Sequence, residues 1–326
     1  LKSALEETLL GVAYVEGGDR AVSEGLPFAR ESNLKAFVNI IYGCDNFCAY
    51  CIVPYARGRE QSRTPEDVLA EVREVVAGGY RDVTLLGQNV NSYGHDLAQQ
   101  IDFAELMRHA DAVEGLDRLR FTTSHPKDMT QDLIDTMAAL PSACEHLHLP
   151  IQAGSDAVLE AMGRGYTYAH FRSLIDAARA AIPGLSVTTD VMVGFPGETA
   201  GDFKETLWAF EEIRFDQAFM FKYNDRPGTR AESMEPKVPE EEKQRRLEKL
   251  VALQNETARE INVALEGAVF ELLVEEPDPK SEGHVRGRTR QQKLMIFPGD
   301  EALIGETVPV RAVEGFLWGW MGERVG

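Results

Sequence analysis

The stretch YGCDNFCAYC, residues 42–51, holds three of the four cysteines in this chain of 326 residues. Cys44, Cys48 and Cys51 follow the spacing C-x3-C-x2-C, and Cys144 lies far downstream. Structural zinc sites use four Cys or His ligands, and bacterial ferredoxins use another spacing with a fourth cysteine. Three thiolates in one loop therefore predict an inorganic centre with one position left for an exogenous molecule. A zinc clip is the alternative.

The segments around this loop alternate between strand and helix patterns. The predicted strands are residues 36–42, 82–87, 118–123, 146–151, 185–195 and 217–223, and the predicted helices are 64–79, 103–113, 130–140, 155–162, 168–182 and 199–213. Such alternation implies an α/β fold of parallel strands with right-handed crossovers. Six units are fewer than the eight of a closed barrel. A doubly wound sheet and a partial, open barrel both fit.

In either fold, ligands bind at the carboxyl ends of the strands. The stretches that follow the first five predicted strands are the cysteine loop, GQNVNSYG (87–94), TSHPKD (123–128), IQAGS (151–155) and GFPGE (194–198). Glycine-rich loops follow strands in many α/β proteins, but five in a row indicate a shared site at this edge.

The C-terminal part changes character after a long charged helix, residues 240–265. Short β runs separated by turn residues then predict a small five-stranded barrel of the oligonucleotide-binding type. The expected domains are a lead-in at 1–33, the α/β domain at 34–235, the linking helix at 236–265 and the small barrel at 266–326.

Composition narrows the class of protein. A net charge of −19 argues against a broad nucleic-acid-binding surface, although a local basic patch stays possible. No apolar run reaches the roughly 20 residues of a membrane span, so no membrane partner is expected. Clustered cysteines favour a reduced, cytoplasmic site over a secreted disulfide framework. The first residue is Leu1, so the chain is expected to be part of a longer protein.

The cysteine triplet after the first strand resembles the radical S-adenosylmethionine (SAM) superfamily. The resemblance implies a 4Fe–4S cluster on the three cysteines, with SAM on the fourth iron, and SAM cleavage to a 5′-deoxyadenosyl radical. By the same resemblance Tyr50 lies near the SAM adenine, and Gly87, Gln88 and Asn89 bind its methionyl amino group. Gln152 and Asp190 are expected near the adenosyl moiety. For Asp190 a buried, hydrogen-bonded carboxylate is the alternative.

Longer strings resemble the methylthiotransferases within this superfamily, and most closely the MiaB-type tRNA enzymes. These strings include LLGQNVNSYG (85–94), TSHPKDM (123–129) and DVMVGFPGET (190–199). The resemblance implies methylthiolation of C2 of N6-isopentenyladenosine at tRNA position 37, an electron donor such as flavodoxin or ferredoxin, and a C-terminal TRAM domain. The alternatives are a relative that modifies threonylcarbamoyladenosine or a ribosomal-protein aspartate, and an RNA-binding metal module without catalysis.

The chain departs from that family in one respect. Family members carry three further cysteines in an N-terminal domain, where they hold an auxiliary cluster that delivers sulfur. No cysteine precedes Cys44 here, and a lone Cys144 is expected to be a small buried side chain. We therefore expect this chain to cleave SAM but not to complete sulfur insertion.

Basic residues in two stretches are the candidate RNA contacts. They are Arg57, Arg59, Arg63, Arg286, Arg288, Arg290 and Lys293. Alternate residues of a strand share a face, so the later arginines would form a phosphate track, and a solvated hairpin is the alternative. In FLWGWMGE (316–323), one strand would place Phe316, Trp318 and Trp320 on one face, for core filling or base stacking.

Overall fold

A computed structural model describes residues 32–326, so most of the expected lead-in lies outside the described residues. Within this range, six parallel strands form two three-stranded sheets with the orders β1-β4-β5 and β6-β7-β8. A parallel bridge between Leu119 and Ala143 joins the two sheets. The strands are β1 (Lys35–Asn39), β4 (Asp82–Leu86), β5 (Arg118–Phe121), β6 (His146–His148), β7 (Ser186–Val193) and β8 (Gln217–Lys222). The partial, open α/β barrel is confirmed.

The helices of this domain also match the predicted segments. They are α3 (Pro65–Ala77), α4 (Phe103–Asp111), α5 (Gln131–Ala139), α6 (Asp156–Met162), α7 (Tyr168–Ala181) and α8 (Ala200–Ile213). Hydroxyl caps start several of them. The Thr64 side chain accepts from the Asp67 amide at the start of α3, and Thr199 and Asp202 form a reciprocal capping box at α8. Their apolar faces pack on the sheet as one continuous core.

Along β8, the edge strand of its sheet, side chains that face the core alternate with side chains on the opposite face. Ala218 and Met220 pack against the core, whereas Phe219 and Phe221 are 49% and 52% exposed on the other face. The Phe219 ring contacts His148 of β6, with ring centroids 6.0 Å apart, so this second face is the inner face of the partial barrel.

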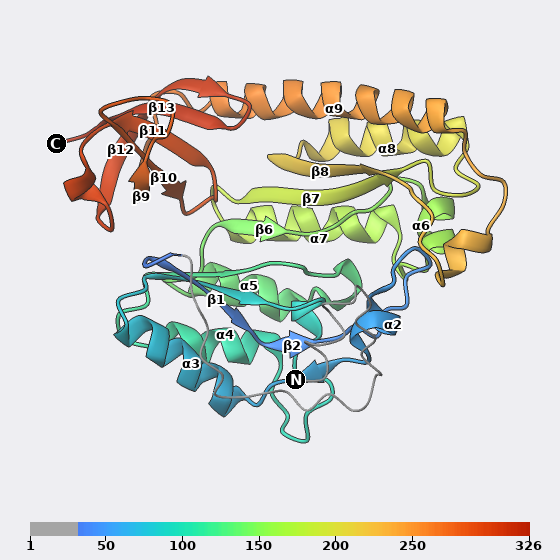
Figure 1. Ribbon diagram of the computed structural model, residues 1–326, viewed down its shortest axis with the longest axis horizontal. Coiled ribbons are helices and arrows are strands. Elements are labelled where there is room, and N and C mark those ends of the chain that lie inside the picture. The colour runs from blue at the N-terminus through green and yellow to red at the C-terminus, as the bar shows by residue number, and fades with distance from the viewer. Residues whose placement is uncertain (1–31) are drawn as a thin grey trace, which may run out of the picture.

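Helix α9 (Glu240–Val263) runs alongside β8 and leads to the C-terminal barrel, as Figure 1 shows. The barrel closes in the order β10-β11-β13-β12-β9, which confirms the predicted five-stranded barrel. Its strands are β9 (Val269–Pro277), β10 (His284–Thr289), β11 (Leu294–Pro298), β12 (Thr307–Phe316) and β13 (Gly319–Arg324). Its core is apolar and contains the fully buried Trp320.

The single strand expected at residues 316–323 is wrong. Phe316 ends β12, residues 317–318 form a turn, and β13 begins at Gly319 with φ +144°. A Cβ on Gly319 would lie 1.9 Å from the Leu294 carbonyl oxygen, so this close approach requires glycine. Trp320 enters the core and stacks on Phe270, whereas Phe316 stacks on the 39% exposed Trp318 at the turn.

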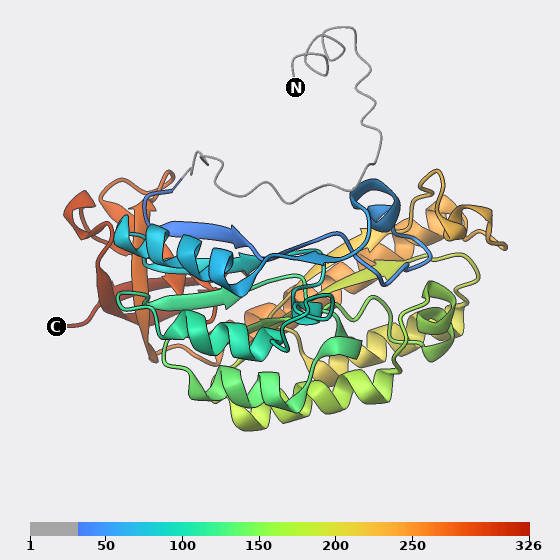
Figure 2. The ribbon, with the colours of Figure 1, turned by 90° about the horizontal axis from the view of Figure 1, so that it is seen from below.

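The C-terminal barrel lies against the amino ends of the parallel strands, at the opposite end of the molecule from the cysteine loop and its helix α2 (Val53–Arg57), as Figures 1 and 2 show. Two buried arginines of β5 make the junction. Arg118 donates to the Arg288 carbonyl at 2.7 Å, and Arg120 donates to the Arg290 carbonyl at 2.8 Å while paired with Asp82. The barrel is therefore fixed by hydrogen bonds from the sheet.

No helix within residues 32–326 combines the length and the apolar character needed to cross a bilayer.

Candidate metal and cofactor site

The cysteine loop is an excursion closed by a short antiparallel pair that the sequence did not predict. Strands β2 (Ile41–Tyr42) and β3 (Gln61–Ser62) pair at its base, and α2 (Val53–Arg57) lies within it. Gly43 has φ +72°, and a Cβ there would lie 2.0 Å from the Arg59 carbonyl oxygen. Only glycine fits beside the returning chain at this point. The loop therefore has one defined path.

The three cysteines of the loop lie within mutual electrostatic reach. Cys44 and Cys48 are each 8% exposed, Cys51 is half-buried, and the Cys51 amide donates to the Cys48 carbonyl at 3.0 Å. Burial, followed by smaller effects that include the other two thiols, raises the pKa of Cys44 to about 11. Burial also raises the pKa of Cys51. The raised pKa values of Cys44 and Cys51 favour the protonated thiols, and metal binding would displace those two protons.

Unpartnered polar atoms gather beside this loop. Among the described residues, five buried side-chain atoms at the carboxyl ends of β1, β4 and β5 lack a hydrogen-bond partner: Asn46 Oδ1, Gln88 Oε1, Asn89 Oδ1, Ser124 Oγ and His125 Nε2. Buried polar atoms in proteins are normally bonded, so this concentration fits a bound group with many donors and acceptors. SAM on a cluster is such a group.

No three His, Cys, Asp or Glu side chains within residues 32–326 lie as close together as ligands of a single metal ion would. The thiolates of an iron–sulfur cluster bind separate iron atoms, and they stand further apart than the ligands of one ion.

Gly87, Gln88 and Asn89, which are predicted to bind the SAM amino group, follow β4, whereas Tyr50 lies within the cysteine loop. A Cβ on Gly87 would lie 2.3 Å from Ile41 Cγ2, so the loop passes tightly under the cysteine segment. Asn89 donates to Asp128 at 2.7 Å and leaves its own oxygen unpartnered. Tyr50 lies within electrostatic reach of Cys48, and burial raises its pKa. The structure brings these residues to one place, and their contact with SAM stays a prediction.

Gln152 lies beyond the end of β6 and pairs through a parallel bridge with Val191 of β7, the strand that also contains Asp190. The Gln152 amide donates to the Asp190 carbonyl at 2.8 Å, and Gln152 has φ 65°, which turns the chain at this bridge. The Asp190 side chain is 31% exposed and lies 3.5 Å from His148 Nε2. It is therefore a half-buried carboxylate on the inner face, and its contact with the adenosyl moiety also stays a prediction.

Three residues of the site were missed from the sequence: Arg164, Tyr166 and His125. Arg164 is 5% exposed and donates to Cys48 Sγ at 3.3 Å. Tyr166 holds it from the side, and the His125 ring meets the Tyr166 ring edge-on at 5.6 Å. The strings GRGYT and TSHPKD contain them, but only the packing of three separate loops shows their proximity.

His125 carries a pH dependence that can be measured. It is 4% exposed, and burial, with Arg164 and Lys127 nearby, lowers its pKa to about 2. The unfolded chain binds a proton below pH 6.5 and the folded chain does not, so stability is lost as pH falls. Between pH 7 and 5, metal-free protein should lose about 2 kcal/mol on this account.

The matched variant is His125→Asn, which keeps an acceptor for the Lys127 amide that now bonds Nδ1. Urea unfolding of both proteins at pH 7 and pH 5 measures the difference. The wild type should lose more stability than the variant over this interval, and equal losses would contradict the buried, neutral imidazole.

The candidate RNA-contacting residues differ in how free their side chains are. Arg57 and Arg59 are exposed on the cysteine loop, with Arg59 paired to Asp45 at 3.0 Å. Arg63 is buried and paired to Glu71 at 2.6 Å.

On β10 and the turn after it, Arg286 is paired to Glu276 at 2.8 Å, while Arg288 donates to a carbonyl and has no ion pair among the described residues. Arg290 pairs with Glu145 at 2.9 Å, and Lys293 with Asp216 at 2.6 Å. Those last two tie the barrel to the sheet. RNA binding by these residues stays a prediction.

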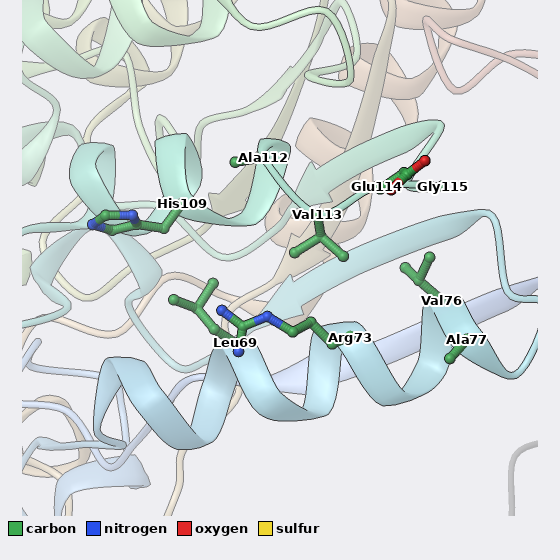
Figure 3. A pocket seen from close by; sticks show the side chains of 9 residues that line it. All are labelled: Leu69, Arg73, Val76, Ala77, His109, Ala112, Val113, Glu114 and Gly115. Carbon is green, nitrogen blue, oxygen red and sulfur yellow. The ribbon is translucent and has the colours of Figure 1, made fainter.

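A surface pocket of about 530 Å³ lies elsewhere, between α3, α4 and the segment after α4. Figure 3 shows its lining, with Arg73 on α3 opposite His109 on α4. None of the predicted site residues lines it. It plays no part in the site.

Known proteins resemble this chain throughout. A model of the radical SAM superfamily matches residues 38–207, and a TRAM domain model matches residues 263–315. A tRNA-2-methylthio-N(6)-dimethylallyladenosine synthase of Carboxydothermus hydrogenoformans is 52% identical over 312 residues, which are 96% of this chain and 70% of that protein. Those of Moorella thermoacetica and Thermoanaerobacter sp. are each 51% identical over 304 residues, or 93% of this chain and 68% and 64% of theirs. The chain therefore spans about two thirds of the length of these relatives.

Solved structures share the fold. The radical SAM methyltransferase TsrM from Kitasatospora setae, with tryptophan substrate and a SAM analogue bound, has a TM-score of 0.52 at 21% identity, covering 65% of this chain and 41% of that one. Coproporphyrinogen III oxidase from Escherichia coli has a TM-score of 0.50 at 16% identity, covering 87% and 67%. At these identities the likeness concerns the fold alone.

Proposed function

Because the chain belongs to the radical SAM superfamily and to its tRNA methylthiotransferase family, we propose that it takes part in methylthiolation of C2 of N6-isopentenyladenosine at tRNA position 37. The observation that carries the proposal is the cysteine loop with five unpartnered polar atoms around it, in a chain about half identical to such synthases.

Cys44, Cys48 and Cys51 would hold a 4Fe–4S cluster, and SAM would close it at the fourth iron. When bound and reduced, the cluster supplies the electron that cleaves SAM, taken from a donor of the flavodoxin or ferredoxin kind. The residues of this chain bind and orient SAM. Gln88 and Asn89 present acceptor oxygens, which suit the SAM amino group, and His125 presents a donor.

The His125 proton sits on Nε2, since Nδ1 accepts the Lys127 amide at 3.2 Å. An Nε2–H without a partner suits an acceptor on the cofactor. Arg164 and Tyr166, both buried, close the site from the side of α6 and exclude water from it.

Abstraction of the C2 hydrogen can be tested apart from sulfur insertion. We expect that reconstituted chain, supplied with SAM and isopentenylated tRNA deuterated at C2 of the target adenosine, transfers deuterium into 5′-deoxyadenosine. Mass spectrometry of the 5′-deoxyadenosine measures it. Ample 5′-deoxyadenosine without deuterium would contradict this substrate assignment, and the same tRNA lacking the isopentenyl group is the control.

Sulfur insertion requires thiols that these 326 residues do not offer. Beyond the loop, Cys144 is the one further cysteine, and it is 4% exposed with its thiol near the Ser142 carbonyl. Burial raises its pKa to about 11, as for an unreactive thiol. We propose that the auxiliary cluster is held outside these residues, so methylthio product from this chain alone would overturn that part.

The C-terminal barrel offers its RNA contacts on β10, where Arg286 and Arg288 alternate with buried residues. The double variant Arg286→Ala, Arg288→Ala should weaken tRNA binding and lower the slope of log K against log salt by up to ~2, one unit per lost phosphate contact. Binding assays at several salt concentrations measure it. Arg311→Ala, which removes an arginine paired with Glu323 on another strand, is the control. Equal slopes in all three proteins would reassign β10 to solubility.

A further inference from the structure

Arg164 differs from every other buried arginine in the described part of the chain. Five arginines there are less than 9% exposed: Arg63, Arg118, Arg120, Arg164 and Arg246. The other four each have a carboxylate partner, namely Glu71, Glu271, Asp82 and Glu198. Arg164 has no ion pair with an acidic side chain within residues 32–326. A buried guanidinium is always charged, and buried charges are normally paired, so its negative partner must be supplied in another way.

Within residues 32–326, each hydrogen bond of the Arg164 guanidinium goes to a neutral group or to a cysteine. Nη2 donates to the Pro150 carbonyl at 3.4 Å, and Nε donates to the Tyr166 hydroxyl at 3.2 Å. Tyr166 is itself held, because its hydroxyl donates to the Ile151 carbonyl at 2.8 Å. The remaining donor, Nη1, lies 3.3 Å from Cys48 Sγ. The charged group is therefore aimed at a predicted cluster ligand.

The local backbone fixes this direction. Helix α6 ends at Met162, whose carbonyl accepts the Ala49 amide of the cysteine loop at 2.8 Å. Gly163 and Gly165 on either side of Arg164 have φ 72° and 71°, so the chain makes two left-handed steps around it. The Arg164 amide closes the helix end on the Leu159 carbonyl at 3.0 Å. Arg164 is thus built into the junction between α6 and the cysteine loop.

We propose that Arg164 is a positioning residue whose counter-charge is the cluster itself, and that it raises the reduction potential of the cluster through Cys48. This inference rests on the proposed cluster. Each thiolate ligand brings a negative charge, and reduction adds one more, so a fixed guanidinium stabilises the reduced form more than the oxidised form. Net charge and hydrogen bonds to sulfur are the means by which proteins set such potentials.

The test is a redox titration of the reconstituted chain, followed by the electron paramagnetic resonance signal of the reduced cluster, without tRNA. At the potential that reduces half of the wild-type cluster, Arg164→Met should contain about tenfold less reduced relative to oxidised cluster, equivalent to ~59 mV for a one-electron couple. Arg164→Lys keeps the charge and should stay near wild type, and Arg164→Gln, a neutral donor, should fall between them.

Arg118→Met is the matched control, because Arg118 is 1% exposed and lies at the junction with the C-terminal barrel, where it donates to the Arg288 carbonyl. The midpoint reduction potential of the cluster in Arg118→Met should equal the wild-type value. Iron content is measured in every variant. An unchanged midpoint in a fully loaded Arg164→Met protein would overturn the proposal.

If Arg164→Met fails to hold iron, the midpoint reduction potentials of Arg164→Lys and Arg164→Gln are compared instead. Equal potentials in these two variants would overturn the proposal. Tyr166→Phe, which removes the hydroxyl that holds Arg164, should lower the midpoint by a smaller amount. A wild-type chain that holds no iron–sulfur cluster would instead refute the proposed function, so the two failures are distinguishable.

Discussion

Replacing Cys48 by serine should reduce 5′-deoxyadenosine formation to background. Cys48 is the middle cysteine of the loop, it is 8% exposed, and it receives the Arg164 hydrogen bond. Losing an outer-shell partner of a metal ligand typically costs roughly 10–100-fold in affinity or activity, and losing the ligand itself should exceed that. Chromatography of the reaction after anaerobic reconstitution measures the product.

Cys144→Ser is the control for this experiment. Cys144 is 4% exposed, against 8% for Cys48, but it lies between α5 and β6 and bonds a carbonyl there. Its replacement should leave SAM cleavage within about twofold of wild type, because a buried cysteine of this kind acts as a small apolar side chain. Loss of cleavage in Cys144→Ser but not in Cys48→Ser would place the cluster elsewhere.

Replacing Arg246 by methionine should cost about 3–5 kcal/mol of folding free energy, because it leaves the Glu198 carboxylate buried without its cation. Arg246 on α9 lies 2.9 Å from Glu198, and both side chains are 6% exposed or less. Glu198 also accepts the Gly194 and Phe195 amides, so it holds the loop after β7 in place. Urea unfolding measures the change.

The double variant Arg246→Met, Glu198→Gln separates the ion pair from packing. It removes the orphaned charge and should recover part of the lost stability. If the single variant unfolds at the same urea concentration as wild type, the Arg246–Glu198 ion pair contributes nothing to the free energy of unfolding. If the double variant is less stable than the single one, the loss comes from packing and not from the buried charge.

Much of the fold followed from local pattern, because the apolar runs and hydroxyl caps that define elements are short-range signals. The predicted β6 was too long, since regular pairing ends at His148 and only a single bridge, from Gln152 to Val191, follows it. Pro150 lacks an amide for the ladder, which agrees with the early end. In the C-terminal barrel, the aromatic run at residues 316–323 contains a hairpin turn that the sequence did not predict. Gly319 follows this turn and has to be glycine because the Leu294 carbonyl lies against it. Residues 316–323 alone do not indicate that contact.

The site residues that could be predicted are those that lie close together in the sequence. Cys44, Cys48 and Cys51 stand together in the sequence, and their loop proved to be one structural unit. Arg164 and His125 belong to it only because α6 and the loop after β5 fold back on the cysteines, and no local pattern records that contact. Conversely, the sequence grouped Arg290 and Lys293 with the exposed arginines, whereas they pair with Glu145 and Asp216, which directly precede β6 and β8.

We propose above all that the cysteine loop holds a 4Fe–4S cluster that cleaves SAM. The most direct measurement is anaerobic reconstitution of the 326-residue chain with iron and sulfide, followed by metal analysis and reaction with SAM and dithionite. We expect roughly four iron and four sulfide per chain and formation of 5′-deoxyadenosine and methionine. Tightly bound zinc in place of iron, with no SAM cleavage, would contradict it.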